Sequence, residues 1–585
     1  MYEQILDPVG DSLGLTSIFA ALPLVTLFVM LGVLKIKAWI AALVSLGVAL
    51  VVAVLVYSMP VDQAILSATE GAAFGFFPIL WIVINAIWVY NLTVATGHFD
   101  VLRRSFERVS PDQRIQAIII AFCFGALLEA LAGFGTPVAI TVVMLMALGF
   151  RPVKAAAVAL IANTAPVAFG ALATPIVTLA DVTSGVNDDP RLTVDTLGAM
   201  VGRQTPILAV VVPLVLVHVV DGRRGLRQTW LPALVAGLSF GIAQFVAANY
   251  MSVQLTDIIA ALVSAAALVV LLRVWQPVES PDLVDHDHEY AAQVRSGHRD
   301  STARAAAGTG STAIGAGATG AHGGSGGSTT MTGPVRDSGT EIAKAYAPYL
   351  IIIAIFSVAN INSVKEALAE EPWTTAFMWP GLDIVNPAGE PLASMEFKLN
   401  WLPAAGTLMI FAGILTALVL RISPGRALTA YKDTYVELRW AIVTVMAVLG
   451  LAYVMNQSAQ TSTLGAFLAG AGGIFVFLAS ILGWLGVAVT GSDTSANALF
   501  GALQVQTAAK AGLDPVLLAA ANSSGGVMGK MVSPQNLAIA AAAVGMAGQE
   551  GVIFRKVLGW SLVLLLFMCV IVTLQSTSVL GWMVP

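Results

Sequence analysis

The sequence has few charged residues and almost no cysteine. Of its 585 residues, 11% are charged and 57% are hydrophobic, whereas soluble domains carry about 25% charged residues. The two cysteines, Cys123 and Cys569, lie within apolar runs, so neither a disulfide framework nor a metal cluster is expected. Many apolar runs reach about 20 residues, enough to cross a hydrocarbon core of about 30 Å. The composition predicts a polytopic helical membrane protein and argues against a closed β-barrel, which would show short alternating segments.

The scarce basic residues set the expected orientation. Basic residues face the cytoplasm, and the arginines of the 98–114 segment place it inside and the N-terminus outside. These arginines are Arg103, Arg104, Arg108 and Arg114. Uninterrupted spans are expected at about 15–34, 38–57, 74–95, 203–220, 231–250, 254–273, 344–361, 401–420, 438–456 and 557–576. With the interrupted segments described below, they predict an all-α polytopic fold with about twelve transmembrane helices and two re-entrant hairpins.

A segment of different composition separates two membrane halves. Gly, Ser, Ala and Thr dominate it, as in Gly308–Thr332, and no apolar period is present. Such a segment cannot bury a core, so residues 276–342 are predicted to be a disordered cytoplasmic linker between halves at 1–275 and 343–585. Its histidines have no ordered spacing and predict no metal site: His286, His288 and His298.

Two distant stretches carry the same interruption of an apolar run. The first reads Glu129-Ala-Leu-Ala-Gly133-Phe-Gly135-Thr136-Pro137 and continues with Asn163-Thr164-Ala165-Pro166 and Thr174-Pro175. The second reads Gly491-Ser492-Asp493-Thr494-Ser495-Ala496-Asn497 and continues with Asn522-Ser523-Ser524-Gly525-Gly526 and Ser533-Pro534. In both, an Asn-Thr/Ser pair precedes a Thr/Ser-Pro pair by the same interval. Paired interruptions in two halves indicate a binding site near the membrane midplane.

The charge map suggests how these interruptions cross the membrane. Residues 115–150 leave a basic loop and return to another, which predicts a re-entrant hairpin followed by a broken span at 153–180. A second hairpin at about 467–510, followed by a broken span at 515–546, would open to the other side and make the repeat inverted. Two ordinary spans with a tight outside turn are the alternative for the first hairpin.

The interruptions supply candidate binding groups. Lipid cannot satisfy the backbone groups of a broken helix, so such breaks occur inside protein or beside a water-filled cavity. Half-helix N-termini also suit a carboxylate. The breaks at Gly133–Pro137, Asn163–Pro166, Gly491–Asn497 and Asn522–Gly526 are therefore expected to meet. The candidate substrate-binding residues are Gly133, Gly135, Thr136, Asn163, Thr164, Ser492, Thr494, Asn522, Ser523, Ser524 and Lys530. Alternatively, the glycines only allow close helix packing.

Three charged residues lie in or beside the interruptions. An ionised Glu129 is costly at this depth, which makes it a candidate proton carrier or the partner of a structural cation. Asp493, at the second tip, is another proton-coupling candidate and is expected to be solvated. Lys530 could attract a substrate carboxylate, counter Glu129 or Asp493, or extend to the membrane interface.

These motifs resemble the bacterial L-lactate permease family, which includes glycolate permeases. The resemblance covers nearly the whole chain except 278–340. The segments that carry it are Pro111–Arg114, Phe122–Ala126, Ala132–Ile140, Asn163–Gly170, Val201–Gln204, Asn522–Gly526 and Gly529–Asn536.

The resemblance implies a function and a location. A member of this family imports 2-hydroxymonocarboxylates with protons across the bacterial plasma membrane; L-lactate is the expected substrate, with D-lactate and glycolate. The expected partners are this substrate, the lipid bilayer and a second copy of the chain in a homodimer. No nucleic acid is expected, and no cofactor is expected beyond the co-transported H⁺. The paired hairpins also look like those of elevator-type transporters, which is a likeness of fold only.

Other function classes remain open to different degrees. Unwound carbonyls and small hydroxyls could also hold Na⁺, so Na⁺-coupled carboxylate transport is one alternative. An uncoupled channel or facilitator is another. An intramembrane enzyme is not expected, because the sequence contains neither His-Glu-x-x-His nor Gly-x-Gly-Asp.

Overall fold

A computed structural model describes residues 1–107, 109–110, 112–133, 135–187, 189–276, 337–387, 389–546 and 549–585. Most of the predicted linker, with its three histidines, lies outside these described residues. The expected linker end at residue 342 falls within helix α14 (Gly339–Ala359).

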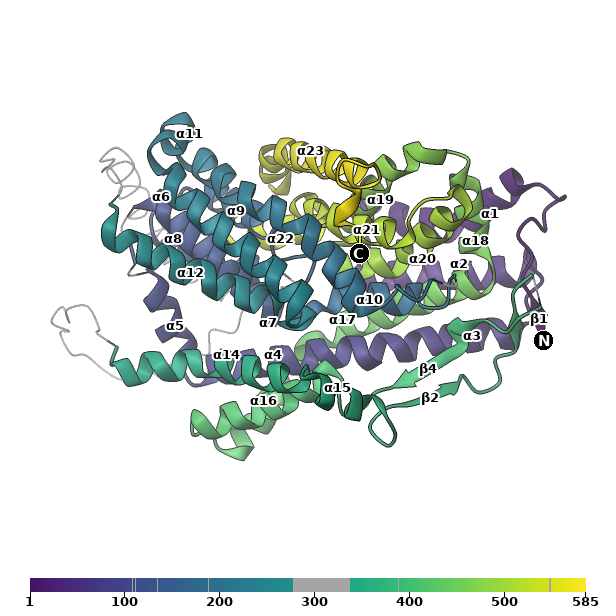
Figure 1. Ribbon diagram of the computed structural model, residues 1–585, viewed down its shortest axis with the longest axis horizontal. Helices are drawn as coiled ribbons and strands as arrows, with labels where there is room; N and C mark the ends of the chain where they lie inside the picture. The colour runs from purple at the N-terminus through teal and green to yellow at the C-terminus, as the bar shows by residue number, and fades with distance from the viewer. Residues whose placement is uncertain are drawn as a thin grey trace, which may run out of the picture.

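The described part of the chain is mostly helical, as the composition predicts (Figure 1). The first-half helices are α1 (Leu13–Phe28), α2 (Ala38–Leu55), α3 (Val61–Phe74), α4 (Trp81–Ala95), α5 (His98–Glu107), α6 (Gln113–Gln116), α7 (Gly125–Ala132), α8 (Thr136–Ala147), α9 (Pro152–Ala162), α10 (Thr174–Thr183), α11 (Val194–Tyr250) and α12 (Thr256–Val274). After α14, the second-half helices are α15 (Asn362–Ala369), α16 (Ala405–Val419), α17 (Pro424–Gln457), α18 (Gln460–Ala469), α19 (Phe475–Thr490), α20 (Asp493–Ala511), α21 (Pro515–Gly529), α22 (Pro534–Ala543) and α23 (Glu550–Gln575).

Ten helical stretches of the described residues are long and apolar enough to cross a membrane. Four shorter apolar helices accompany them: Thr136–Ala147, Pro152–Ala162, Ala171–Thr183 and Ala405–Val419. The spans expected at 203–220 and 231–250 are joined in α11, which is interrupted by non-helical backbone at Asp221, Gly222 and Thr229. The span expected at 74–95 begins earlier, because α3 and α4 form one helical stretch from Val61. The total of about twelve crossings stays a prediction.

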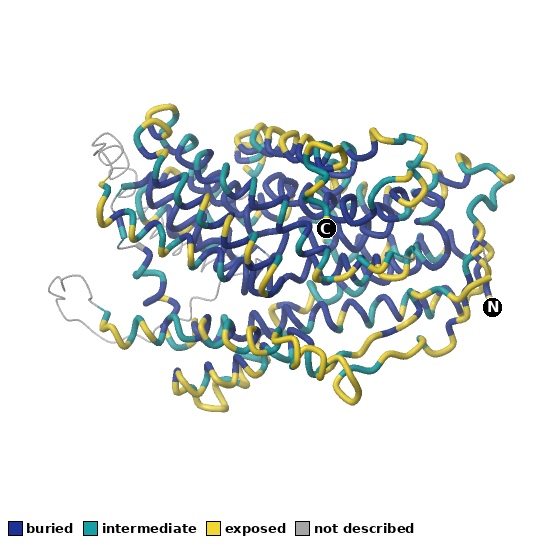
Figure 2. Tube along the Cα trace, viewed as in Figure 1, coloured by how far each residue is buried: buried dark blue, intermediate teal, exposed yellow. Residues whose placement is uncertain are grey.

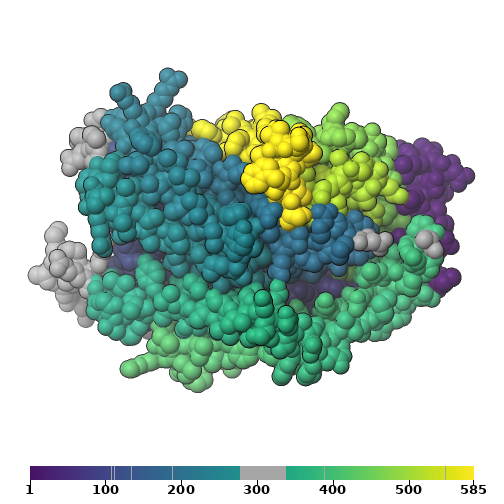
Figure 3. Space-filling model, in the orientation of Figure 1, coloured from purple at the N-terminus to yellow at the C-terminus, as the bar shows by residue number. Residues whose placement is uncertain are grey.

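Most helices run along the long axis of the molecule (Figure 1). The N-terminus and β1 lie at one end, whereas the end of α12 and the start of α14 lie at the other. Segments expected on opposite sides of the membrane therefore lie at opposite ends. Figure 3 shows residues near the C-terminus (yellow) against the blue N-terminal half, so the two halves pack against each other.

Burial separates central helices from peripheral ones (Figure 2). The stretch Gln113–Ala132, which includes a π-helical segment at Ala117–Phe124, is buried along its whole apolar window. By contrast, Leu13–Val33 and Ala38–Leu55 are each 33% buried in theirs. The segment that carries Glu129 is therefore surrounded by protein, which is where charged residues in membrane proteins are tolerated.

The predicted helix breaks occur at three of the four expected places. In the first half, α7 ends before Gly133, α8 begins after Gly135, and 163–173 separates α9 from α10. In the second half, Gly491 separates α19 from α20. The break expected at Asn522–Gly526 is wrong, because α21 runs through it and the turn comes later, at Lys530–Val532.

Close packing explains why α21 continues through its glycines. A Cβ at Gly525 would collide with the backbone of Ser480, and one at Gly529 with the backbone of Trp484, both on α19. These glycines allow α19 and α21 to approach closely. At Asn522–Gly526, the glycines therefore allow close helix packing and do not break the helix.

The expectation of an all-α protein needs a small correction. Between the spans expected at 344–361 and 401–420 lies a loop rich in acidic residues, 363–400, which the charge map places outside. It contains the antiparallel pair β2 (Thr375–Met378) and β4 (Glu396–Leu399). It also contains β3 (Ile384–Val385), which pairs in parallel with β1 (Tyr2–Glu3). These strands were missed because they are short and lie outside the apolar spans. They tie the N-terminus to this loop.

Candidate functional site

The first element of the candidate site is a buried ion pair between the two halves. Lys530 Nζ lies 2.6 Å from Glu129 Oε1, and Asn163 Nδ2 donates to Glu129 Oε2 at 2.9 Å. Lys530, Glu129 and Asn163 are 6%, 2% and 4% exposed. Lys530 therefore does not extend to an interface; it counters Glu129, one of the roles the sequence left open.

The second element is a hydrogen-bonded group around Asp493. Ser523 Oγ donates to Asp493 Oδ2 at 2.6 Å. Asn522 Nδ2 donates to Asn497 Oδ1 at 2.9 Å, and Asn497 Nδ2 in turn donates to the carbonyl of Pro175 at 3.0 Å. Asp493 is 4% exposed, so the expectation that it is solvated is wrong. The start of α20 is covered by α10 and α21, which the sequence could not show.

The two elements are electrostatically linked. Lys530 forms its ion pair with Glu129 and also lies within electrostatic range of Asp493. Asp493 Oδ1 and Asn163 Oδ1 are buried and have no hydrogen-bond partner among the described residues. A buried acceptor without a donor is costly. The site therefore has unused acceptor capacity beside its cation.

Glycine is required where the two tips approach their neighbours. Gly135 has a φ of +87°, and a Cβ there would collide with the side chain of Ile539 on α22. A Cβ at Gly526 would collide with Asp493 Oδ1. The first tip thus packs against α22 of the other half, and α21 makes room for the Asp493 carboxyl group. Gly133, with a φ of +38°, ends α7.

Other predicted binding residues have local or distant partners. Thr164 Oγ1 donates to the carbonyl of Ile161 at 2.6 Å, and Ser524 Oγ donates to Gln204 Oε1 at 2.6 Å. Ser492 accepts from Ser495 N as the cap of α20. Thr136 is half-buried at the start of α8, and Thr494 is buried in the first turn of α20. The geometry therefore leaves Thr164 and Ser524 outside the two hydrogen-bonded groups. The predicted residues that it brings together are Glu129, Asn163, Asp493, Asn522, Ser523 and Lys530.

Sequence reasoning missed a third buried carboxyl group. Asp257, in the first turn of α12, is 2% exposed and accepts from Gln244 Nε2 at 2.9 Å. Gln244 also donates to the carbonyl of Ala165, within the break at 163–173. Asp257 lies within electrostatic range of Glu129. The sequence does show a single acidic residue at the start of this apolar helix. Acidic residues are common in the first turn of helices, however, because they interact favourably with the helix dipole.

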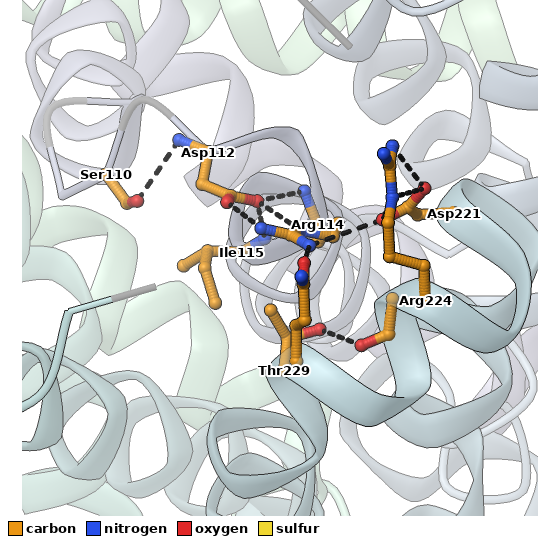
Figure 4. Close-up of polar contacts among 9 residues, drawn as sticks. Ser110, Asp112, Arg114, Ile115, Asp221, Arg224 and Thr229 are labelled. Atoms are coloured by element: carbon orange, nitrogen blue, oxygen red, sulfur yellow. Dashed lines mark hydrogen bonds and ion pairs between the residues drawn. The ribbon is translucent and has the colours of Figure 1, made fainter. Parts of the chain in front are cut away.

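A second buried cation lies near the interruption of α11 (Figure 4). Arg114 is fully buried, its Nη2 lies 2.7 Å from Asp112 Oδ2, and its Nη1 lies 3.3 Å from Asp221 Oδ2 and donates to Gln228 at 2.5 Å. The sequence treated Arg114 as a basic loop residue, which is wrong. A guanidinium group can bond several acceptors at once, so Arg114 holds the start of α6 against the interruption of α11.

Comparison with known proteins assigns the chain to a family. The family model described as L-lactate permease matches residues 16–579. The L-lactate permease of Bacillus subtilis (strain 168) is 41% identical, with all of both chains covered. The glycolate permease GlcA of Escherichia coli (strain K12) is 38% identical over 100% of this chain and 99% of that protein. A crystal structure of the YdaH transporter of Alcanivorax borkumensis covers 82% of this chain and 87% of that chain, at 14% identity and a TM-score of 0.31, which is too low to establish a shared fold.

The family match and the apolar helices agree with each other. A match over nearly the whole chain and ten apolar helices of spanning length describe one multi-pass membrane protein. The chain belongs to the L-lactate permease family.

Proposed function

We propose that this protein imports L-lactate and related 2-hydroxymonocarboxylates, including D-lactate and glycolate, by proton symport across a bacterial plasma membrane. Relatives that match its full length are named L-lactate permease and glycolate permease. Both names describe transport of small 2-hydroxycarboxylates. The observation that carries the mechanism is the buried ion pair between Lys530 and Glu129.

The ion pair suggests how substrate and proton are coupled. A substrate carboxylate that approaches Lys530 competes with Glu129 for the same ammonium group. Once displaced, the Glu129 carboxylate is a buried charge without its cation, which is costly, so it takes up a proton. The site then holds Lys530 with the substrate anion and a neutral Glu129, and its net charge is unchanged.

This exchange has an energetic advantage. Moving an anion into a negative interior costs about 2.3 kcal/mol per 100 mV for each charge. A proton that travels with the substrate cancels this cost. Glu129 and Lys530 then return to their ion pair when both ligands leave on the other side.

Backbone groups complete the proposed substrate site. The starts of α8 and α10 have no side-chain cap, so the positive ends of their helix dipoles can face a carboxylate. We assign the substrate hydroxyl to the acceptors Asn163 Oδ1 and Asp493 Oδ1, which lack other partners among the described residues. The hairpins at 115–150 and 467–510, with the broken spans that follow them, would move as one unit against the remaining helices.

Uptake by the purified protein in liposomes tests the proposal. Labelled L-lactate, D-lactate and glycolate are offered under an imposed proton gradient, with and without Na⁺. We expect concentrative L-lactate uptake that needs no Na⁺ and collapses with a protonophore. Uptake that requires Na⁺ would indicate Na⁺ coupling instead. Uptake that never exceeds the external concentration would indicate a channel or facilitator.

Two substitutions test the residue roles. Glu129→Gln should abolish uptake driven by a proton gradient, and lactate accumulation with proton entry in this variant would contradict the role of Glu129. Lys530→Ala should raise the apparent Km for lactate sharply. An unchanged Km would remove Lys530 from the substrate site.

A further inference from the structure

Another buried carboxyl group lies on α3, a helix that contacts the loop at 363–400, which is called the external loop below because the charge map places it outside. Glu70, on α3, has no exposed surface. Its Oε2 accepts from Gln457 Nε2 at 2.7 Å, whereas its Oε1 is buried without a hydrogen-bond partner among the described residues. No basic side chain of the described residues forms an ion pair with Glu70. An ionised Glu70 would therefore be an uncompensated charge in the membrane region.

Gln457 provides an independent sign that a ligand is missing. It is fully buried on α17, and its Oε1 also lacks a hydrogen-bond donor among the described residues. A primary amide and a carboxylic acid can pair through two hydrogen bonds, one in each direction. One of these bonds is present, from Gln457 to Glu70. A proton on Glu70 Oε1 supplies the donor for the other, so one proton satisfies both unpartnered oxygens.

A further carboxyl group faces the same region from another helix. Asp181, in the last turn of α10, has a buried Oδ2 without a partner among the described residues. The buried Tyr453 of α17 lies within electrostatic range of both Glu70 and Asp181. Lys398, exposed on β4, is the charged group in range of Asp181. Asp181 is therefore within electrostatic range of an exposed residue of the external loop and of a tyrosine that is also in range of Glu70.

Helix α10 connects this region to the candidate substrate site. Its second residue, Pro175, accepts from Asn497 of the Asp493 group at 3.0 Å. Asp181 lies six residues later, about 9 Å along the helix axis. Glu70 and Tyr453 belong to α3 and α17, which pack against each other. A displacement of α10 at its broken start would therefore move Asp181 relative to Glu70.

We propose that Glu70, paired with Gln457 and reached through Asp181, binds a second transported proton from the external side. The inference rests on the proposed proton symport and extends it. Lactate with one proton carries no net charge, whereas lactate with two protons carries one positive charge inward. The second proton makes transport sensitive to the membrane potential.

Proteoliposomes with an imposed potassium diffusion potential test the proposal. In the unaltered protein, an inside-negative potential should accelerate lactate uptake at a fixed pH gradient without Na⁺. In Glu70→Gln, which keeps both hydrogen bonds to Gln457, the acceleration should vanish while uptake driven by the pH gradient persists. Asp181→Asn should slow the potential-driven component. Asp62→Asn, an exposed acid on the same helix, is the matched control and should behave like the unaltered protein.

The outcomes separate this inference from the proposed function. Uptake by the unaltered protein that ignores the potential, or a Glu70→Gln variant that still responds to it, would overturn the second proton site alone. A potential response that requires Na⁺ would assign the site to Na⁺ instead of a proton. Uptake that ignores the pH gradient in the unaltered protein would overturn the proposed symport. Exchange of internal for external lactate, which needs no net proton movement, verifies that each variant is folded.

Discussion

The two halves of the chain have interruptions at the same spacing, but these interruptions differ in local structure. In the first half, α8 and α10 begin after residues in the left-handed conformation, Gly135 and Ala173, and no side chain caps either start. In the second half, Ser492 and Ser533 cap α20 and α22. The first half therefore leaves two uncapped, positive helix ends for an anion, and the second half supplies the cation, Lys530. Repeated spacing does not require repeated roles.

The largest expected effect comes from removing the cation of the second half. Lys530→Met leaves the buried Glu129 without its cation, and breaking such a pair by removing one partner costs about 3–5 kcal/mol of folding free energy. The double variant Glu129→Gln/Lys530→Met should recover most of this stability and still fail to transport. Thermal unfolding of the detergent-solubilised protein and uptake in liposomes measure the two effects.

Arg114→Met is the matched control for this test. It removes a buried cation that pairs with Asp112 and Asp221, both in the first half. It should destabilise the protein by a similar amount, and no single carboxyl substitution should restore stability, because both Asp112 and Asp221 lose a partner. Recovery by Asp221→Asn alone would contradict the network described for Arg114.

The next effect concerns the tip of the first half. Gly135→Ala introduces a Cβ at a positive φ and against Ile539. We expect proton-driven uptake to be lost, and Gly135→Ala/Ile539→Ala to recover part of it. Gly545→Ala, also at a positive φ but with open space around it, is the control and should cost only the backbone strain of about 1–2 kcal/mol. Equal uptake by Gly135→Ala and Gly545→Ala would show that the tip contact is unimportant.

A smaller effect should distinguish the capped starts from the uncapped ones. Ser533→Ala removes an acceptor from the backbone N–H of Asn536 and should lower stability by about 1 kcal/mol. Thr136→Ala, at the uncapped start of α8, should leave the melting temperature unchanged and weaken lactate binding. A drop in melting temperature for Thr136→Ala with normal binding would reverse the comparison.

The smallest effect lies at the surface, where the halves meet again. Arg191 Nη2 lies 2.7 Å from Asp189 Oδ2 and 2.9 Å from Asp514 Oδ2, at the start of α21. The hydrogen bond from Arg191 lowers the pKa of Asp189 below its usual value. This contribution to stability is therefore complete above the unfolded-state pKa and is lost as the pH falls through the lower folded-state pKa. Because Arg191 is partly exposed, it amounts to under about 1 kcal/mol.

Melting curves as a function of pH measure this contribution. Asp189→Asn should melt slightly below the unaltered protein at neutral pH, and the difference should shrink in acid. A difference that grows as the pH falls would contradict the sign of the shift. High salt should reduce the difference at neutral pH.

Much of the fold could be predicted from the sequence because membrane spans follow from apolar length alone. The breaks at Gly133–Gly135, near Asn163 and at Gly491 also follow from local chemistry, since glycine and proline end helices. The continuous helix through Asn522–Gly526 could not be predicted in the same way. There the glycines allow close contact with α19. Glycine-rich sequence is found both at helix breaks and at close helix contacts, so the sequence does not distinguish the two.

The candidate site was only partly predictable for a related reason. The sequence identified Glu129 and Lys530 as unusual residues but left several partners open, because no local pattern specifies a contact between distant segments. Asp493 was expected to be solvated because it lies at a predicted hairpin tip. Its burial comes from packing against α10 and α21, which no local pattern specifies. Arg114 was expected in a basic loop. Its burial could not be predicted, because it depends on Asp221, a distant residue in the interruption of α11.

The contact between Lys530 and Glu129 also constrains how the protein is made. The two residues are 401 positions apart, so at about 5–20 residues per second the acid leaves the ribosome roughly 20–80 s before its cation. During this interval the newly inserted first half must keep Glu129 neutral or hold it near water. A nascent chain arrested before residue 530 would lack this ion pair between the halves, and membrane proteases should degrade it faster than the full chain.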